Sequence, residues 1–185
     1  MPHFLTGWSR CLGFTPQKSR FTSESDGRDS EREKACIFCA VSVENGFDIV
    51  WENQSFVAFR DHRPAALHHI QLIPRTHIES VKALSKADIQ LAQEMEEIGH
   101  HILDELGVAR NMRRLGFHIP PFNTVSHLHL HVQALPYNSF WRRLKYPVIS
   151  AGGTGKYQKG PSWFAEVGQV IRILERDGRV GALWC

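Results

Sequence analysis

An alternating run of histidines over residues 126–133 (SHLHLHVQ) is the part of the sequence whose residue types and spacing point most directly to chemistry. Imidazole binds metals, attacks electrophiles and exchanges protons near neutral pH. Successive side chains of an extended strand point to opposite faces. We therefore expect His127, His129 and His131 on one face of a strand, with the intervening apolar residues on the other face, against the core.

Nucleophilic catalysis accounts for this face more completely than metal binding does. His127 and His131 would lie roughly 13 Å apart on a strand, so they cannot share one ion through bonds of about 2 Å. Attack by His129 on an electrophile, with its two neighbours holding the surrounding charges, gives every histidine a role. Phosphorus suits this scheme because a phosphorylated imidazole is labile enough to be hydrolysed in a second step. Residues 123–126 (NTVS) supply hydroxyl and N–H groups for the phosphoryl oxygens.

The composition is that of a soluble globular protein: 185 residues, of which 42% are hydrophobic and 22% charged. Full disorder is excluded, and no apolar run approaches the roughly 20 residues that span a membrane. The net charge of +3 is too small to indicate nucleic acid as a partner. Four cysteines are too few for a disulfide scaffold of this size, whereas ten of the eleven histidines fall between His62 and His131.

The chain divides into four parts by composition. Residues 1–34 are predicted to be a disordered N-terminal extension, because residues 19–34 mix charge with Ser and Gly and have little to bury. Residues 35–148 are predicted to form the folded domain, 149–160 a linker, and 161–185 a C-terminal helix and tail. We expect the protein in the cytoplasm and nucleus; mitochondrial targeting by residues 1–23, which lack acids, is the alternative.

The predicted elements are those of an α+β protein. Residues 47–52 and 56–61 resemble a hairpin, and 69–73, 112–118 and 127–135 are further strands. A long helix follows Ser85 and Asp88, which can form a capping box, and ends at Gly107. A last short helix is expected from Pro161 to Asp177. Together these elements predict a mostly antiparallel sheet with one long helix and short flanking helices.

Four motifs, in order, resemble the histidine triad (HIT) superfamily of nucleotide hydrolases and transferases. They are residues 36–39 (CIFC), 57–61 (VAFRD), 69–78 (HIQLIPRTHI) and the histidine run with Val132 and Gln133. The resemblance covers Cys36 to about Leu135 and implies a HIT-like fold for the predicted domain. Residues 116–122 (GFHIPPF) resemble the third vertebrate branch of the histidine triad nucleotide-binding proteins, and also aprataxin, a DNA-deadenylating relative.

The resemblance implies a catalytic role for each of four histidines. His129 is expected to attack the α-phosphorus of an adenylylated amine, forming an AMP-histidine intermediate that water then cleaves. His131 is expected to hydrogen-bond the phosphate, and His127 to lie behind the nucleophile, together with His69. His118 matches a histidine of aprataxin, and would neutralise phosphate charge or protonate the leaving group.

The resemblance also implies a nucleotide site. The carboxylate of Asp61 would accept hydrogen bonds from both ribose hydroxyls, although a strand-end turn residue is the plainer interpretation. His62 would border the base, and Thr124 would bind the phosphate together with His129 and His131. The adenine would lie in an apolar slot, whose members could equally be ordinary core: Ile37, Phe38, Val41 and Phe59.

The function implied is that of a hydrolase, an adenosine 5'-monophosphoramidase cleaving the P–N bond of adenosine phosphoramidates and aminoacyl-adenylates. An aprataxin-like DNA 5'-adenylate hydrolase and a non-enzymatic nucleotide-binding scaffold are the alternatives. We expect AMP-containing small molecules as substrates, a homodimer or larger homo-oligomer, and neither membrane nor nucleic acid as partner. No cofactor or metal is expected to be required, and a zinc ion held by Cys36, Cys39, His69 and His127, as in some relatives, is left open.

Overall fold

The computed structural model describes residues 36–149 and 159–181. Its strands form one sheet in the order β1-β2-β3-β5-β4-β6, with every neighbouring pair antiparallel. The predicted extension over 1–34 and nearly all of the predicted linker lie outside the described residues. The elements are β1 (Ile49–Glu52), β2 (Phe56–Arg60), β3 (His69–Pro74), η1 (Lys86–Asp88), α2 (Ile89–Glu105), η2 (Arg110–Met112), β4 (Arg113–His118), β5 (Leu130–Ala134), α3 (Phe140–Arg143), β6 (Phe164–Glu166) and α4 (Val167–Glu175).

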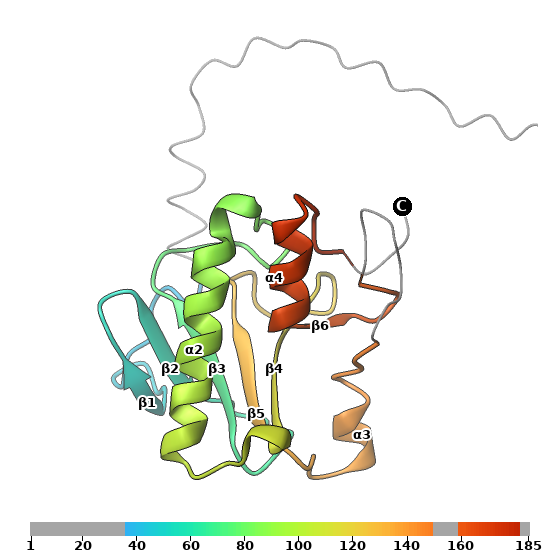
Figure 1. Cartoon of the computed structure of the whole chain (residues 1–185). Helices are drawn as coiled ribbons and strands as arrows, with labels where there is room; N and C mark the ends of the chain where they lie inside the picture. Colours follow the sequence, from blue (N-terminus) through green and yellow to red (C-terminus); the bar gives the residue numbers. More distant parts are fainter. Residues whose placement is uncertain (1–35, 150–158, 182–185) are drawn as a thin grey trace, which may run out of the picture.

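Two helices cover one face of the sheet. Helices α2 and α4 pack against each other and against β3, β4 and β5, so they lie side by side over the middle of the sheet (Figure 1). Leu72, Leu130 and Val132 point into this layer and are completely buried, as are Met95 and Leu103 of α2. Within the described residues, α2 and α4 cover the face to which Leu130 and Val132 of β5 point. His131 points to the opposite face, as the alternating pattern predicts. The α+β prediction is confirmed.

Local signals set the ends of α2. The predicted capping box is present at η1, the turn that leads into α2, where Asp88 Oδ2 accepts the backbone N–H of Ser85 at 2.8 Å. At the other end Gly107 has φ +68°, a left-handed conformation that glycine adopts without strain. The backbone N–H of Val108 then bonds to the carbonyl of Leu103 at 2.9 Å and closes the helix.

The histidine strand is shorter than predicted, because pairing between β3 and β5 starts at Leu130 opposite Leu72. Pro74 has no N–H to continue the ladder, and residues 127–129 lie outside β5, with a bend at His127. The backbone N–H of Leu128 bonds instead to the carbonyl of Ile78, at 2.6 Å.

The C-terminal segment differs from the sequence prediction of a helix from Pro161. Residues Phe164–Glu166 form β6, which pairs with β4, and α4 begins only at Val167. Gly116 makes this pairing possible: a Cβ there would meet the backbone oxygen of Ala165 and, at 2.6 Å, the ring of Phe164. The sheet therefore gains a sixth strand where helical periodicity alone predicted the start of a helix.

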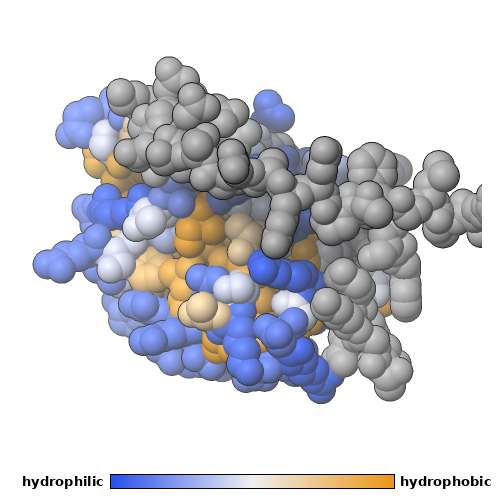
Figure 2. Space-filling model, turned by 90° about the horizontal axis from the view of Figure 1, so that it is seen from above, coloured by the Kyte–Doolittle hydropathy of each residue, from blue (hydrophilic) through white to orange (hydrophobic). Residues whose placement is uncertain are grey.

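No helix within the described part of the chain is long and apolar enough to cross a membrane. Figure 2 views the molecule from above, onto the end at which α2 begins. There, apolar surface is gathered in the middle of the coloured part, with hydrophilic residues to its left and below it.

Candidate functional site

The three histidines of the triad lie on the sheet face opposite α2 and α4, and all three are buried. His127 is 1% exposed, His129 7% and His131 4%, so this is not the solvated face of a surface strand. Leu128 and Leu130, between them in sequence, are buried in the core on the other side. The alternation predicted from the sequence is confirmed.

The backbone of His127 fixes the protonation state of His129. The Nδ1 of His129 lies 2.6 Å from the carbonyl oxygen of His127. A carbonyl can only accept, so Nδ1 carries the ring proton and Nε2 keeps its lone pair. Burial, outweighing this hydrogen bond, lowers the pKa of His129 below that of an ordinary histidine. The ring is therefore neutral at pH 7, in the tautomer that a nucleophile needs.

A chain of hydrogen bonds links three further histidines in one direction. It begins at the backbone N–H of Ala65, which donates to His69 Nδ1 at 3.1 Å. The Nε2–H of His69 then donates to His131 Nδ1 at 2.9 Å, and the Nε2–H of His131 donates to His118 Nδ1 at 2.9 Å. The chain ends where His118 Nε2–H donates to the carbonyl of Lys145 at 2.8 Å. A donor at one end and an acceptor at the other fix all three tautomers.

Gln133 lies behind this chain. Its amide nitrogen is 3.2 Å from His69 Nε2, and its amide oxygen accepts from the hydroxyl of Tyr137 at 3.1 Å. Two N–H groups cannot bond to each other. With a proton on His69 Nε2, the amide of Gln133 therefore turns over, so that its oxygen accepts from His69 and its NH₂ group donates to the Tyr137 hydroxyl.

Burial keeps the chain uncharged. It lowers the pKa of His69 to about 4, although the carboxylate of Asp61 opposes the shift. Burial also lowers the pKa of His118, against its bond to Lys145. The pKa of His131 falls well below the ordinary value, first through burial and then through the imidazoles around it. At pH 7 this chain of histidines therefore offers polarisable N–H donors and carries no positive charge.

Asp61 is held as a carboxylate directly after β2. Burial would raise its pKa, but the neighbouring His69 and two hydrogen bonds outweigh this and lower it. Gln71 donates its side-chain amide to Oδ2 at 2.6 Å, and the backbone N–H of Arg63 donates to Oδ1 at 2.7 Å. His69 Nε2 is 3.5 Å from Oδ2. Both carboxylate oxygens keep lone pairs for further donors, such as hydroxyl groups.

A cavity of about 620 Å³ opens in front of these groups and is large enough for a nucleotide. Asp61, His118, His129 and His131 line it, so the structure brings together the predicted carboxylate and three of the four predicted catalytic histidines. His62 and Thr124 line it too, and both are exposed. Sequence reasoning missed other residues of the lining, for which the chain offers no local signal: Arg63, Gln71, Phe122, Leu144, Lys145, Tyr146 and Trp163.

The predicted adenine slot lies beside the cavity. Phe38 and Phe59 are buried in a small apolar cluster, with Val41 packed against it. The ring of Phe38 meets that of His129 edge-on, with centroids 5.6 Å apart. Ile37 differs from the other three, because 59% of its surface is exposed. Phe38 thus contacts the nucleophile, Phe59 and Val41 belong to the same apolar cluster, and Ile37 is at the surface.

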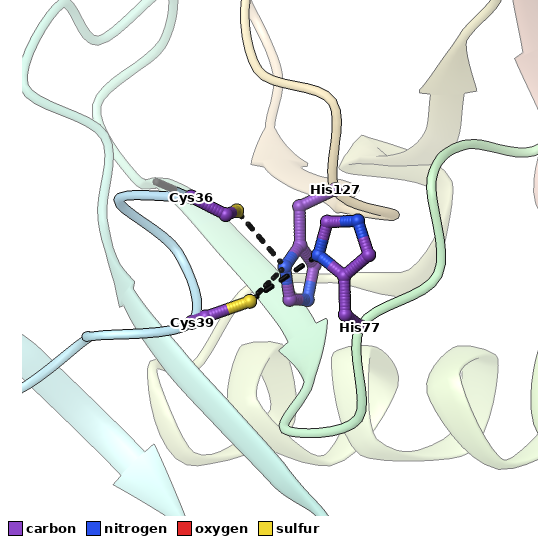
Figure 3. Close-up of side chains that lie close together, drawn as sticks. All are labelled: Cys36, Cys39, His77 and His127. Atoms are coloured by element: carbon purple, nitrogen blue, oxygen red, sulfur yellow. Dashed lines mark hydrogen bonds between the residues drawn. The ribbon is translucent and has the colours of Figure 1, made fainter. Parts of the chain in front are cut away.

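His127 belongs to a second cluster, with Cys36, Cys39 and His77. One ligand atom from each residue lies within 4.8 Å of all the others. His127 Nδ1 is 3.4 Å from Cys36 Sγ, and His77 Nδ1 is 3.2 Å from Cys39 Sγ. Figure 3 shows the four side chains pointing toward one another, from the segment before β1, the loop after β3 and the loop before β5.

This cluster corrects the ligand set considered from the sequence. His69 was the expected partner of the cysteines, but it lies in the hydrogen-bonded chain with His131, and His77 takes its place. The sequence signal for His77 is the motif at residues 73–78 (IPRTHI), in which this histidine follows β3. Two thiolates and two imidazoles are a ligand set that zinc accepts in tetrahedral geometry, so the residues fit this metal. His127 Nε2 donates to the carbonyl of Pro74 at 2.8 Å, which leaves Nδ1 free to bind.

Comparison with known proteins places this arrangement in a family. Residues 35–146 match the family model described as "Scavenger mRNA decapping enzyme C-term binding". The HIT family hydrolase from Legionella pneumophila shares the fold, with a TM-score of 0.52 and 26% identity over 57% of this chain and 96% of that one. The fold, the buried triad and the family match together define the class: this chain belongs to the histidine triad family.

Named relatives show where it stands within this family. Adenosine 5'-monophosphoramidase HINT3 of Danio rerio is 40% identical over 123 residues, which are 65% of this chain and 76% of that protein. The bifunctional adenosine 5'-phosphosulfate phosphorylase/adenylylsulfatase HINT4 of Arabidopsis thaliana is 39% identical over 65% of this chain and 84% of that protein. Aprataxin of Danio rerio is more distant, at 30% identity, and this chain spans 44% of its length. The chain is thus a protein of the HINT type, similar to HINT3.

Proposed function

We propose that this protein is an adenosine 5'-monophosphoramidase, a hydrolase that cleaves the P–N bond of adenosine phosphoramidates and aminoacyl-adenylates. The observation that carries the proposal is the unprotonated Nε2 of His129, which is left free because Nδ1–H donates to the His127 carbonyl. His129 lines a cavity that Asp61 also lines. The names of the relatives at 39–40% identity support the choice of adenylyl compounds, since both act on adenosine 5'-phosphate derivatives.

The geometry supports a reaction in two steps. In the first, His129 Nε2 bonds to the α-phosphorus, the P–N bond breaks, and the departing amine takes up a proton. This proton passes from solvent through the hydrogen-bonded pair of His131 and His118, 2.9 Å apart, in which each neutral imidazole accepts one proton as it releases another. In the second step water attacks the phosphorus, the bond to His129 Nε2 breaks, AMP leaves, and the proton of that water returns to solvent by the same path. Positioned donors around the phosphoryl oxygens stabilise both transition states.

The proposed substrate orientation follows from the same groups. The ribose hydroxyls would donate to the carboxylate of Asp61, whose lone pairs remain available. The phosphoryl oxygens would accept from Thr124 and from the Nε2–H of His131, which donates to His118 Nδ1 in the absence of substrate. These steps use no metal, and none of the four residues of the cluster around Cys36 lines the cavity.

Intact-mass spectrometry during turnover of adenosine 5'-phosphoramidate tests the proposal. The wild type is expected to carry an adenylyl adduct, and the adduct and AMP release should both vanish in His129→Gln. His101→Gln is the matched control, because His101 lies on α2 with an exposed side chain paired to Glu105. Turnover without dependence on His129 would refute the mechanism, and absence of both adduct and turnover would favour the non-enzymatic scaffold.

Adenylated DNA belongs in the same substrate panel, because aprataxin-like deadenylation is the remaining enzymatic alternative. We expect adenosine 5'-phosphoramidate to be cleaved at least tenfold more efficiently than adenylated DNA. The reverse preference would transfer the protein to the aprataxin-like class.

Cellular location and assembly are proposals from the family resemblance. We expect the protein in cytoplasm and nucleus, and a homodimer in solution, which fractionation of tagged cells and sedimentation velocity would measure. A purely mitochondrial signal or a monomer at micromolar concentration would contradict these two expectations.

A further inference from the structure

We propose that a second cavity, at the end of the sheet where β5 ends and β4 begins, binds a small carboxylate with an apolar body. The inference goes beyond the proposed function and does not depend on it. It comes from three features of the described chain: a separate cavity with apolar walls, a tyrosine hydroxyl there that lacks an acceptor, and two arginines whose charge no acid of the lining balances.

The second cavity has a volume of about 530 Å³, which is in the range of small-molecule sites. It is lined by η2, the start of β4 and the segment that contains α3, at the end of the sheet where α2 terminates (Figure 1). None of its described lining residues also lines the cavity in front of His129. The two cavities are therefore separate, although the stacked rings of Tyr137 and Tyr146, 5.6 Å apart, each contribute to one of them.

The hydroxyl of Tyr137 is a donor without an acceptor. The N–H of Ala65 fixes a proton on His69 Nε2, and this proton turns the oxygen of Gln133 toward His69. The NH₂ group of Gln133 then donates to the Tyr137 oxygen, which lies 3.1 Å from the Gln133 amide. The O–H of Tyr137 must therefore donate to another group, and the described residues place no second partner within hydrogen-bond distance. An acceptor bound in the cavity would complete its bonding.

Two arginines of the lining supply positive charge beside this hydroxyl. Arg143, exposed at the end of α3, makes no side-chain hydrogen bond or ion pair within the described part of the chain. Arg114 has one ion pair, from Nη1 to Glu166 at 3.4 Å, and its Nε is buried without a hydrogen-bond partner. Burial raises the pKa of Tyr137 to about 12, whereas the charges of Arg114 and Arg143 oppose this rise and that of Glu166 adds to it. Both guanidinium groups are thus close enough to act on the hydroxyl.

These groups define the class of ligand. The described lining contains two arginines and no acid, which favours an anionic head. A carboxylate can accept from a guanidinium and from a phenolic O–H at the same time. The rest of the lining is largely apolar, and its members Met112 and Phe140 are 37% and 64% exposed. A hydrocarbon body would remove this surface from water, whereas acetate or inorganic phosphate would satisfy only the charged half of the site.

Titration of the ¹⁵N-labelled full chain with octanoate, followed by NMR, tests this inference. We expect saturable shifts of the backbone amides of residues 112–114 and 135–143. Octanamide has the same body without the charge, and acetate has the same head without the body. Each should bind at least about tenfold more weakly than octanoate, because each lacks one half of the interaction. Equal affinities of octanoate and octanamide would overturn the proposal, as would the absence of saturable binding by octanoate.

Single substitutions identify the groups that hold the carboxylate. Arg143→Gln should weaken octanoate binding about tenfold, because it removes a charged donor that has no other partner in the described chain. Tyr137→Phe should weaken it several-fold while keeping the ring. Arg172→Gln is the matched control, since Arg172 is exposed on α4, and should leave the affinity within twofold. Unchanged affinity in both Arg143→Gln and Tyr137→Phe would refute the site.

The position of the shifts separates this site from the catalytic cavity. Octanoate should bind with the same affinity when AMP is present, because the two cavities share no described lining residue. Shifts centred on Asp61, His129 and His131 instead would place the carboxylate in the catalytic cavity and overturn the inference. No readout here depends on turnover, so a failure of the phosphoramidase proposal leaves this test unaffected, and the reverse also holds.

Discussion

The ring of His118 lies 2.9 Å, Nδ1 to Nε2, from that of His131, and this contact joins the strand before the triad to the triad itself. It gives His131 an acceptor and thereby determines which of its nitrogens carries the proton. The residue at position 118 is therefore part of the hydrogen-bonded chain, even though it lies nine or more residues from the triad in sequence.

Replacing His118 by glutamine should slow the chemistry more than it weakens binding. The variant interrupts the proton path from His131 to the Lys145 carbonyl, and loss of one proton-transfer group typically costs 10²–10⁴-fold. We expect a fall of about 100-fold in kcat for adenosine 5'-phosphoramidate, with KM within threefold. Single-turnover mass spectrometry would show the formation of the His129 adduct slowed. Unchanged kcat in His118→Gln would show that His118 only supports the fold.

The buried histidines make the stability of the protein depend on pH below neutrality. In the unfolded chain they protonate near pH 6.5, whereas in the folded chain burial keeps the pKa of His69 at about 4. Between these values the unfolded state binds more protons, so the stability that is present above pH 6.5 is lost as the pH falls toward 4. His69 alone accounts for at most about 3 kcal/mol of this loss.

Urea unfolding at pH 7, 6, 5 and 4 measures this dependence. The free energy of unfolding should fall steadily across the series in the wild type, and less steeply in His69→Gln. Parallel curves for the two proteins would mean that His69 is not the buried neutral group described here.

We predict that Cys36, Cys39, His77 and His127 bind a zinc ion, and substitutions of single residues test this ligand set. Protein purified without chelator should contain about one zinc per chain, measured by mass spectrometry of the metal. His77→Gln and Cys39→Ser should lower this content several-fold, because each removes a ligand from the tetrahedral set. His69→Gln is the control and should retain the metal. Loss of zinc in His69→Gln but not in His77→Gln would reverse the assignment.

Gly116 should be intolerant of any side chain. A Cβ at this position would overlap the backbone oxygen of Ala165 and approach the Phe164 ring to 2.6 Å, so Gly116→Ala forces β6 away from β4. Overpacking of this kind costs about 1–3 kcal/mol, which urea unfolding would detect. At Gly181 an added Cβ meets nothing within 4 Å, and Gly181→Ala should leave the stability unchanged. Equal stability of the two variants would contradict the close packing of β6.

The sequence predicts those features of the structure that depend on residues close together in the chain. The alternation of histidines with apolar residues predicted that His129 and Leu130 point to opposite faces. The Ser85–Asp88 pair and Gly107 marked the two ends of the long helix. Strand β6 was missed because Phe164 and Val167 fit the helical spacing of the residues after them, while a three-residue strand is defined by its partner. Which of His69 and His77 meets the cysteines likewise depends on how β3 crosses the sheet, and not on spacing.

Because β6 is folded back from the same polypeptide, one chain supplies both the Asp61 end and the Trp163 end of the cavity. The described surroundings of His129 thus come from a single polypeptide. We expect the specific activity to stay constant when the protein is diluted through the concentration at which an oligomer dissociates. Assembly and turnover would then be independent of each other.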